Sequence, residues 1–296
     1  MSTAHPRLFG GRYEVVATLG RGGMACVYRA HDRVLERDVA LKVVSEATDD
    51  VRDQFVTEAR LLARLSHEAI VTPFDAGLDD TPPWLVLELV EGQPLSRVLA
   101  AGPVGHGVLA GLSAQVAAGL AHAHAAGVVH QDVKPSNVMV AASGRARLTD
   151  FGVARLVVDD EPVGDDERVV GTAAFMAPEQ LRGEKVTGAA DVYALGLLLL
   201  EALTGTPSFP DSSMDARLVR LHHGPLIPAS LPRGWPALLA AMTALAPGSR
   251  PSAEGVACRL RDLARDHAAH DMTERTQTMP VVRRVVSPVD GLGDEA

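Results

Sequence analysis

The sequence predicts an α+β protein of two lobes, in which a five-stranded antiparallel sheet with one main helix precedes a mainly helical lobe. Short runs of alternating apolar and polar residues predominate up to residue 89, and apolar residues at helical spacing predominate after it. Segment 88–94, ELVEGQP, turns to Gly and Pro and is typical of a connector. We therefore expect a first lobe over residues 11–89, a second over residues 90–267, an N-terminal extension at 1–10 and a disordered tail at 268–296.

The composition favours a soluble protein with a large core and argues against several partners. Hydrophobic residues make up 47% of the 296 residues, enough to bury such a core. A formal net charge of -9, without a cluster of Lys or Arg, argues against nucleic acid. The start of the chain lacks the apolar core of a signal peptide, and the longest apolar run, near 195–200, is too short for a membrane segment. Two cysteines far apart favour a cytoplasmic location without disulfides.

The first two strands enclose a glycine-rich turn. Residues 13–19 alternate, the turn GRGG follows at 20–23, and residues 26–30 again have the pattern of a strand. Glycines let backbone N–H groups approach phosphate oxygens without an intervening side chain. The turn therefore predicts a phosphate-binding loop, with an ordinary flexible hairpin as the alternative. The expected strands of the sheet are 13–19, 26–30, 38–44, 70–76 and 84–89.

Lys42 and Glu58 are charged residues on faces that the pattern predicts to be packed. In the third strand Lys42 lies between apolar neighbours, where a lysine is costly unless it meets an anion. In the expected helix 51–65, Glu58 shares a face with Phe55 and Leu62 and needs a partner. We expect Lys42 and Glu58 to pair. The alternatives are a snorkelling surface lysine and a solvated glutamate at the edge of the helix face.

Lysine is rare in this chain. Lys42, Lys134 and Lys185 are the lysines among 28 basic residues, and all others are arginines. Where either base would serve on a surface, the chain has arginine, so a lysine indicates a position that needs a compact ammonium, such as a point contact to phosphate. Lys42 lies in the third strand and Lys134 lies among other polar residues suited to phosphate chemistry, with coincidence as the alternative explanation.

The stretch 129–152, VHQDVKPSNVMVAASGRARLTDFG, has the polar groups needed to handle a metal-bound phosphate. Asp132, Lys134, Asn137 and Asp150 supply two carboxylates, an ammonium and an amide. Between Asn137 and Asp150 the pattern predicts a β-hairpin. Because a hairpin would return Asp150 to the side of Asn137, these two oxygen ligands could share a magnesium ion.

The rest of the second lobe is predicted to be helical, with one long irregular segment. Segment 153–171 contains two acidic groups and has the character of a mobile loop. His122 and His124 are spaced poorly for one helix face, so we expect packed or solvated histidines rather than metal ligands. The expected helices are 95–101, 108–126, 188–204, 214–223, 235–245 and 253–266.

With these residues identified, the chain resembles the eukaryotic-like (Hanks-type) serine/threonine protein kinases of bacteria over residues 10–267. The resemblance implies a bilobal protein kinase fold and transfer of the γ-phosphoryl group of ATP to Ser or Thr hydroxyls of proteins, including the chain itself. It rests on an ordered set of motifs: GRGGMACV, VALK, the helix with Glu58, HQDVKPSN, DFG, GTAAFMAPE, DVYALG and Arg250.

The resemblance implies a catalytic role for four of these residues. Lys42 would hold the α and β phosphates and be oriented by Glu58. Asp132 would accept or orient the substrate hydroxyl, and Lys134 would neutralise the transferring phosphoryl group. Asn137 and Asp150 would bind Mg²⁺, with Mn²⁺ as an alternative metal. A pairing of Glu179 with Arg250, and hydrogen bonds from the catalytic-loop backbone to Asp191, are implied as structural features.

It also implies which residues bind ATP. The glycine turn would cover the phosphates, and the adenine would lie between apolar side chains and bond to the backbone of segment 88–90. The implied nucleotide-binding residues are Leu19, Gly20, Gly22, Gly23, Val27, Ala40, Lys42, Leu87, Glu88, Val90 and Met139.

Three departures from the family pattern concern regulation. Ala25 replaces the third glycine of the turn, which we expect binding to tolerate. Gln131 stands where the family usually has an Arg that pairs with a phosphate on the activation segment. Segment 153–171 contains no Ser, Thr or Tyr. Our hypothesis is an activation segment that needs no phosphorylation; the alternative is a loop that is simply acidic and disordered.

The sequence leaves other functions open. A nucleotide-binding pseudokinase or scaffold is the main alternative, and a small-molecule phosphotransferase is a second, disfavoured by the GTAAFMAPE segment. Thr276 and Thr278 resemble sites that phosphothreonine-binding forkhead-associated proteins bind, although Thr-rich tails are commonly solvated linkers. Transient kinase dimers are possible. Cys26 could face the nucleotide, with a small filling side chain as its expected role.

Overall fold

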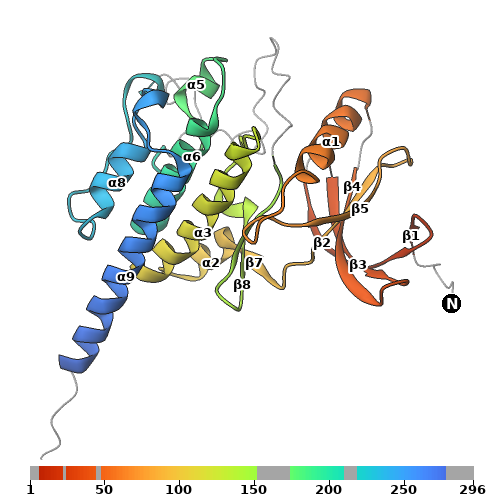
Figure 1. Ribbon diagram of the computed structural model, residues 1–296, viewed down its shortest axis with the longest axis horizontal. Helices are drawn as coiled ribbons and strands as arrows, with labels where there is room; N and C mark the ends of the chain where they lie inside the picture. Colours follow the sequence, from red (N-terminus) through yellow and green to blue (C-terminus); the bar gives the residue numbers. More distant parts are fainter. Residues whose placement is uncertain (1–6, 23–24, 45–47, 152–173, 210–218, 278–296) are drawn as a thin grey trace, which may run out of the picture.

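The protein folds into two lobes of different secondary structure. The structure, a computed structural model, describes residues 7–22, 25–44, 48–151, 174–209 and 219–277, with 268–277 by backbone alone. In Figure 1 an antiparallel sheet with one helix forms one lobe, and helices make up most of the other. Strands predominate up to residue 87, and helices predominate after residue 94.

The first lobe contains a six-stranded antiparallel sheet, so the prediction of five strands was wrong. The additional strand pairs Phe9 with Tyr13, and Gly10 and Gly11 between them have φ values of 55° and 64°. A strand of two residues is too short to show alternation, but the Gly-Gly pair is a turn signal that could have revealed it. The strands in spatial order are β1 (Leu8–Phe9), β2 (Tyr13–Arg21), β3 (Ala25–Asp32), β4 (Arg37–Val44), β6 (Trp84–Leu87) and β5 (Pro73–Gly77).

The two faces of this sheet are packed differently. Val27 lies opposite Lys42 and Cys26 opposite Val43, and residues opposite each other in an antiparallel pair share a face. The face with Lys42 joins the main core of the protein. The face with Val43 forms a separate small core made of Phe9, Tyr13, Ala30, Val39, Leu41, Val43, Trp84 and Val86.

Helix α1 (Asp49–Leu62) packs on the Lys42 side of the sheet. The Thr48 hydroxyl accepts a hydrogen bond from the Val51 backbone N–H at 3.4 Å and caps the first turn. Phe55, Ala59 and Leu62 form its buried stripe, as the sequence pattern predicts. Phe55 lies about one turn before Glu58 and Leu62 about one turn after it, so Glu58 faces the sheet rather than solvent.

A second, three-stranded sheet lies where the lobes meet. It consists of β7 (Gly92–Pro94), β8 (Val138–Ala141) and β9 (Ala146–Leu148), in that order. Part of the segment predicted to be a connector is thus a strand. Gly92 is required there, because a Cβ at this position would lie 2.2 Å from the Val140 carbonyl oxygen. The predicted hairpin is present as β8 and β9, with Gly144 at φ 76° in its turn.

Residues 69–71 attach the first lobe to this second sheet. The Leu148 N–H donates to the Ala69 carbonyl oxygen at 2.8 Å, and the Val71 N–H donates to the Leu148 carbonyl oxygen at 3.0 Å. Arg147 Nη2 also lies 2.9 Å from Glu88 Oε1, at the end of strand β6. The lobes are therefore joined by these contacts as well as by the continuous chain through residues 88–91.

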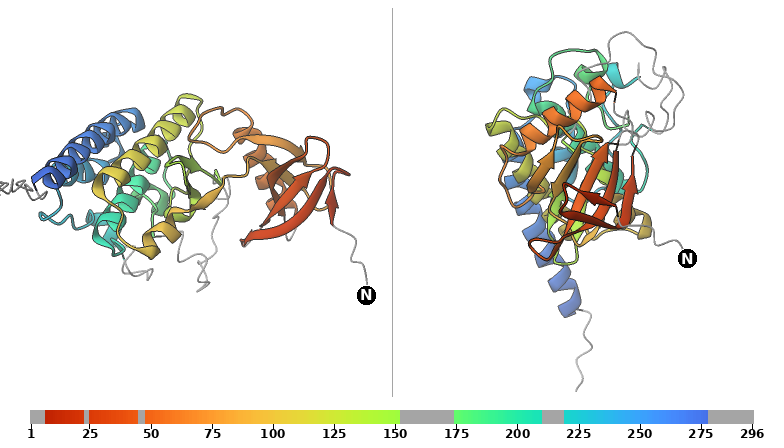
Figure 2. Two further views of the ribbon diagram at one scale, coloured as in Figure 1. Left: turned by 90° about the horizontal axis from the view of Figure 1, so that it is seen from below. Right: turned by 90° about the vertical axis from the view of Figure 1, so that its right-hand side faces the viewer.

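The second lobe is built around helix α6 (Gly188–Thr204), of which every residue from Ala190 to Leu200 is buried. Helix α9 (Ala253–Gln277) packs along α3 (His106–Ala125), as Figure 2 also shows, and continues beyond the predicted end at residue 266 into the segment expected to be a tail. The predicted helix 214–223 lies partly outside the described residues. The other helices are α2 (Leu95–Ala101), η1 (Pro135–Asn137), α5 (Pro178–Leu181), α8 (Trp235–Met242) and η2 (Pro247–Ser249).

A buried ion pair fixes α5 to the loop before α9. Arg250 Nη1 and Nη2 lie 2.6 and 2.8 Å from the two carboxylate oxygens of Glu179. The guanidinium also donates to the carbonyl oxygens of Ala189, Ala244 and Leu245. The expected Glu179–Arg250 pair is therefore present, with its polar atoms well supplied with partners.

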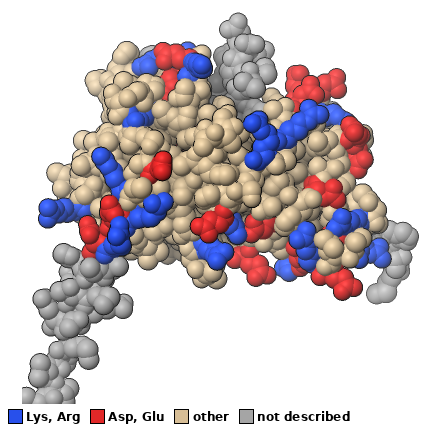
Figure 3. All heavy atoms as spheres, viewed as in Figure 1, with Lys and Arg blue, Asp and Glu red and all other residues tan. Residues whose placement is uncertain are grey.

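The surface carries both charge signs. On the face shown in Figure 3, Lys and Arg lie in several groups, the longest of them a stripe on the upper right, and Asp and Glu lie between and beside them. None of the helices within the described ranges is long and apolar enough to cross a bilayer.

Candidate active site

Lys42 of β4 is held by one carboxylate from each lobe. Its Nζ lies 2.7 Å from Glu58 Oε1 on α1 and 2.7 Å from Asp150 Oδ1, directly after the β8–β9 hairpin. The expected pairing of Lys42 with Glu58 is thus present, and Asp150 joins it. We call these three residues the lysine triad.

The triad carries an excess of negative charge. Burial alone would lower the pKa of Lys42, but the charges of Asp150 and Glu58 outweigh it and hold that pKa above its usual range. Lys42 in turn holds the pKa of Asp150 below its ordinary value, whereas burial raises the pKa of Glu58. The triad thus has two carboxylates for one ammonium, and the carboxylate of Asp150 is half exposed to solvent.

The glycine turn opens at the edge of the same sheet face. Gly20 lies opposite Val27, and the Gly22 N–H donates to the Ala25 carbonyl oxygen at 2.8 Å. Leu19 lies at a register shift of β2 and is exposed. A Cβ on Gly20 would meet nothing within 4 Å, so its surroundings are open. Gly23 lies outside the described residues.

The residues expected around the adenine fall into two groups. Val27, Ala40 and Leu87 belong to the core that continues from the Lys42 face, and Ala40 pairs directly with Leu87. The backbone N–H of Glu88 donates to the Thr72 carbonyl oxygen at 2.8 Å, whereas Val90 is half-buried in the connecting segment. Met139 is in β8 of the other sheet, opposite Pro94 and Arg147.

Asp132 is held by Lys134 and Asn137. Lys134 Nζ lies 2.8 Å from Asp132 Oδ2. Asn137 Nδ2 donates to the same oxygen at 3.0 Å and to the Asp132 backbone carbonyl oxygen at 2.9 Å. These contacts fix the carboxylate of Asp132 in one orientation, with an ammonium and an amide beside it.

The backbone around Asp132 is anchored by Asp191 of α6. Asp191 is buried and accepts hydrogen bonds from the N–H groups of His130 and Gln131 at 2.8 and 2.7 Å, as expected. Gln131 and Asp150 both have positive φ, 65° and 53°, a conformation that non-glycine residues adopt only when their surroundings impose it. The hydrogen bonds to Asp191 supply that constraint at Gln131.

Asn137 and Asp150 offer oxygen ligands suited to a hard divalent cation. The Asn137 carbonyl oxygen accepts a hydrogen bond from the Thr149 N–H at 2.9 Å, so the hairpin does return Asp150 to the side of Asn137. Asn137 Nδ2 is engaged with Asp132, and Oδ1 accepts a hydrogen bond from Ser136 Oγ at 3.4 Å, which leaves this oxygen a second lone pair for a cation. Ionised Asp150 supplies a second oxygen. A pair of protein oxygens fits Mg²⁺, which retains waters and binds phosphate oxygens.

Several contacts at this site were not anticipated from the sequence. Gln180 of α5 donates from Nε2 to the Gln131 carbonyl oxygen at 3.2 Å and accepts from the Ala177 N–H at 2.9 Å. His124 Nε2 lies 2.7 Å from Asp191 Oδ2, so this histidine is packed against the anchor of the loop. No spacing rule links these residues, because they come from separate helices.

Cys26 faces away from Lys42. It is on the sheet face opposite to Val27 and Lys42, in a hollow with Arg7, Tyr28 and Val43. Of the segments expected to regulate the site, Gly152, the acidic segment 153–171 and Thr172 lie outside the described residues.

Comparison with known proteins agrees with this geometry. Residues 13–260 match the family model of the protein kinase domain. The chain is 37% identical over 252 residues to the serine/threonine-protein kinase PknB of Mycobacterium tuberculosis, covering 81% of this chain and 40% of PknB. It is 41% identical over 221 residues to the serine/threonine-protein kinase PknL of the same organism, covering 72% of this chain and 55% of PknL.

A third relative is similar in the same region. A probable serine/threonine-protein kinase of Streptomyces coelicolor is 40% identical over 222 residues, covering 70% of this chain and 32% of the relative. The chain thus aligns with between about a third and just over half of the length of these relatives. On the family match and these identities, the chain belongs to the protein kinase domain family, among the bacterial Hanks-type serine/threonine kinases.

Proposed function

We propose that this protein transfers the γ-phosphoryl group of ATP to Ser and Thr hydroxyls of proteins, including its own chain. The observation that carries the proposal is the lysine triad, in which one ammonium is held between carboxylates of the two lobes. Lys42 would contact two phosphates of a nucleotide, and Glu58 would orient it. The excess negative charge beside it suits a metal cation brought in with the nucleotide.

The nucleotide would bind between the glycine turn and the second sheet. The open surroundings of Gly20 leave room for phosphate oxygens beside the backbone. Val27, Ala40 and Leu87 provide an apolar surface for the adenine, with Met139 and Leu19 as its expected further contacts. Because the Glu88 N–H is already bonded to Thr72, the carbonyl oxygen of Glu88 and the backbone of Val90 are the groups proposed to bind the base.

At the reacting end, Asp132 would accept or orient the hydroxyl of the acceptor. Lys134 and Asn137 hold its carboxylate in place, and Lys134 would also balance charge on the transferring phosphoryl group. Asn137 and Asp150 would hold Mg²⁺, or Mn²⁺, which would supply charge neutralisation of the phosphates. These assignments of individual residues are part of the proposal.

We also propose that the activation segment functions without phosphorylation. Gln131 replaces the family's phosphate-binding Arg, and its backbone is held on one side by Asp191 and on the other by Gln180. Within the described part of the chain, Asp191 and Gln180 thus hold the backbone of Gln131 without a phosphate. Treatment with a protein phosphatase should leave the transfer rate unchanged. A large loss of activity that mapping assigns to Thr172 would contradict this.

The partners and the location of the protein are also proposed. We propose substrates that are proteins with accessible Ser or Thr, a cytoplasmic location and, for the Thr276 and Thr278 region, recognition by forkhead-associated proteins after phosphorylation. Thr276 belongs to the end of α9 and Thr278 lies outside the described residues.

Transfer from labelled ATP tests the activity. The variants Lys42→Met and Asp132→Asn should lose at least about a hundredfold in rate toward the protein itself and a generic basic protein. Lys42→Met removes the group proposed to hold the α and β phosphates, and Asp132→Asn removes the group proposed to orient the acceptor hydroxyl. Lys185→Met is the matched control, since Lys185 is exposed and outside the site, and it should transfer at the wild-type rate. If the wild type transfers no more than Lys42→Met, the protein is a pseudokinase.

A further inference from the structure

The peptide unit that joins Gln131 to Asp132 is held at both of its polar groups. Its carbonyl oxygen, that of Gln131, accepts a hydrogen bond from Gln180 Nε2 at 3.2 Å. Its N–H, that of Asp132, donates to His130 Nδ1 at 3.3 Å. Because a peptide unit is planar and stiff, a turn of this unit would also turn the bond from Cα to Cβ of Asp132. The two contacts therefore bear on the direction in which the Asp132 carboxylate points.

Gln131 needs such contacts to keep its backbone conformation. Its φ of 65° lies in the left-handed region, which a non-glycine residue keeps only when its surroundings impose it. Asp191 accepts from the N–H of Gln131 at 2.7 Å and so holds the preceding peptide unit. The carbonyl group of Gln131 belongs to the next unit and is bound by Gln180. Loss of the Gln180 contact would therefore loosen this unit and leave the contact to Asp191 in place.

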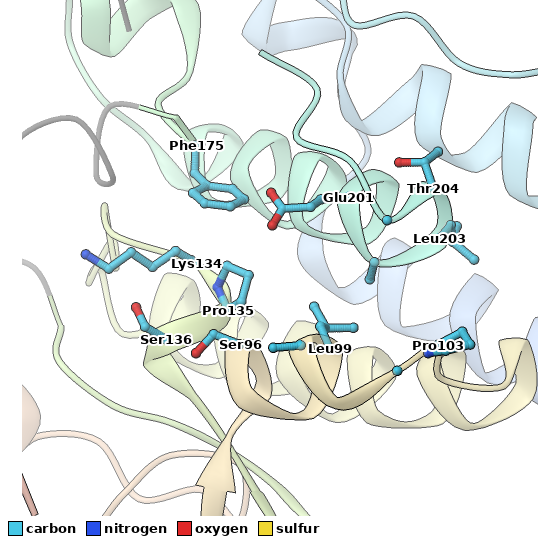
Figure 4. Close-up of a pocket in the computed structure, with 14 residues that line it drawn as sticks. Ser96, Leu99, Pro103, Lys134, Pro135, Ser136, Phe175, Glu201, Leu203 and Thr204 are labelled. Carbon is cyan, nitrogen blue, oxygen red and sulfur yellow. The ribbon is translucent and has the colours of Figure 1, made fainter. Parts of the chain in front are cut away.

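The residues that follow Asp132 border an open space. Lys134, Pro135 and Ser136 form part of the wall of a pocket of about 810 Å³. In Figure 4 they face the space between α2 and the C-terminal end of α6. Within the described part of the chain, this side thus leaves room for the loop to shift. The orientation of the loop at Asp132 therefore depends on the hydrogen bonds around Gln131.

Gln180 itself is held in one orientation. Its Oε1 accepts a hydrogen bond from the Ala177 N–H at 2.9 Å, while its Nε2 donates to Gln131. Only this orientation of the amide satisfies both partners, because an N–H needs an acceptor and a carbonyl oxygen needs a donor. The neighbouring residue Glu179 is fixed by its buried pair with Arg250. Helix α5 therefore presents the amide of Gln180 from a support outside the loop.

The contact to Gln131 requires a hydrogen-bond donor at position 180. An amide donates at any pH, a carboxyl group donates only when protonated, and a leucine side chain does not donate at all. A role of Gln180 limited to capping α5 would use only its Oε1, and a glutamate would keep that acceptor. A glutamate at this position therefore separates the two roles.

We propose that Gln180 is a positioning residue for phosphoryl transfer, which acts through the peptide unit between Gln131 and Asp132 and keeps the Asp132 carboxylate directed at the acceptor hydroxyl. The inference rests on the proposed kinase function and adds to it a residue that does not itself touch the substrate. It also means that a displacement of α5 would be transmitted to Asp132 through one side chain.

Steady-state transfer to a peptide with one Thr tests the role. Gln180→Leu should lower kcat about tenfold and leave the KM for ATP unchanged, because the lysine triad lies outside this contact. Gln180→Glu should show a similar loss at about pH 8 and recover toward the wild type as the pH falls to about 5.5, because the protonated carboxyl group can donate to Gln131. Each kcat is compared with that of the wild type at the same pH.

Gln115 of α3 offers a matched control. Its Nε2 donates to the Gly144 carbonyl oxygen at 3.1 Å and its Oε1 accepts from the Ala146 N–H at 3.0 Å, so it also links two backbone groups. These groups lie at the turn of the β8–β9 hairpin, away from Asp132. Gln115→Glu should therefore keep the wild-type kcat at each pH.

The outcomes distinguish this inference from the proposed activity. A wild-type kcat for Gln180→Leu would overturn the positioning role alone. A loss in Gln180→Glu that equals the loss in Gln180→Leu at every pH would also overturn it, because donation to Gln131 would then not matter. Absence of any ATP-dependent transfer by the wild type would overturn the kinase proposal and this inference with it.

Discussion

Two of the ion-pair centres, the Glu179–Arg250 pair and the lysine triad, differ in how completely their charges are satisfied. In the second lobe, the side chains of Arg250 and Glu179 are 0% and 2% exposed, and the guanidinium also donates to backbone carbonyl oxygens around it. In the lysine triad, the side chains of Lys42, Glu58 and Asp150 are 12%, 16% and 46% exposed. Lys42 there meets two carboxylates.

The difference separates a structural pair from a binding site. In the Glu179–Arg250 pair the positive charge balances the negative charge. The donors of the guanidinium are already hydrogen-bonded, so the pair has no charge or donor left to bind a ligand. The lysine triad has one negative charge too many, and its Asp150 is half open to solvent. An uncompensated and accessible charge is what a nucleotide with its metal ion can use.

The largest effect expected from this comparison concerns stability. Arg250→Met should lower the free energy of unfolding by about 3 to 5 kcal/mol, because it leaves the carboxylate of Glu179 buried without a partner. Denaturant unfolding followed by circular dichroism measures this. Lys42→Met is the companion variant and should lower that free energy much less, since Asp150, one of the two carboxylates that lose the ammonium, is half exposed to solvent. Equal losses of unfolding free energy for Arg250→Met and Lys42→Met would show that the two centres stabilise the fold to the same extent.

A smaller effect is expected on the reaction rate when the lysine triad is changed at Glu58. Glu58→Gln should reduce kcat/KM for ATP about tenfold, because Lys42 keeps Asp150 as a partner but loses the contact that orients it from α1. The free energy of unfolding should change little. Glu68→Gln, an exposed glutamate in the loop after α1, is the control and should behave as the wild type. A wild-type rate for Glu58→Gln would show that the Glu58 contact does not serve nucleotide binding.

Much of this arrangement could be predicted from local sequence patterns. The faces of β4 and α1 follow from strand and helix periodicity, and they bring Lys42 to Glu58 although the two belong to different elements. The hairpin pattern between Asn137 and Asp150 likewise predicts their return to one place. The motif set then indicates which charged residues belong to one site.

Other features could not be obtained in this way. Strand β1 is too short to show periodicity. Strand β7 has the Gly and Pro content of a connector, because it lies at a sheet edge where Gly92 must pass close to Val140. Gln180 and His124 contribute through tertiary contacts that carry no spacing signal. The end of α9 was misplaced because its polar last turns lack an apolar stripe from which a helix could be recognised.

The attachment of residues 69–71 to Leu148 has a mechanical consequence. The first lobe is joined to the second by the chain through residues 88–91 and, separately, by the backbone hydrogen bonds of Ala69 and Val71 to Leu148. Two attachment points define an axis, so rotation about the line that joins them is the low-resistance motion, while twisting or sliding of the lobes would stretch one attachment. Leu148 is two residues before Asp150, so the axis passes close to the triad. Opening of the lobes would therefore displace the distant glycine turn most and Asp150 least.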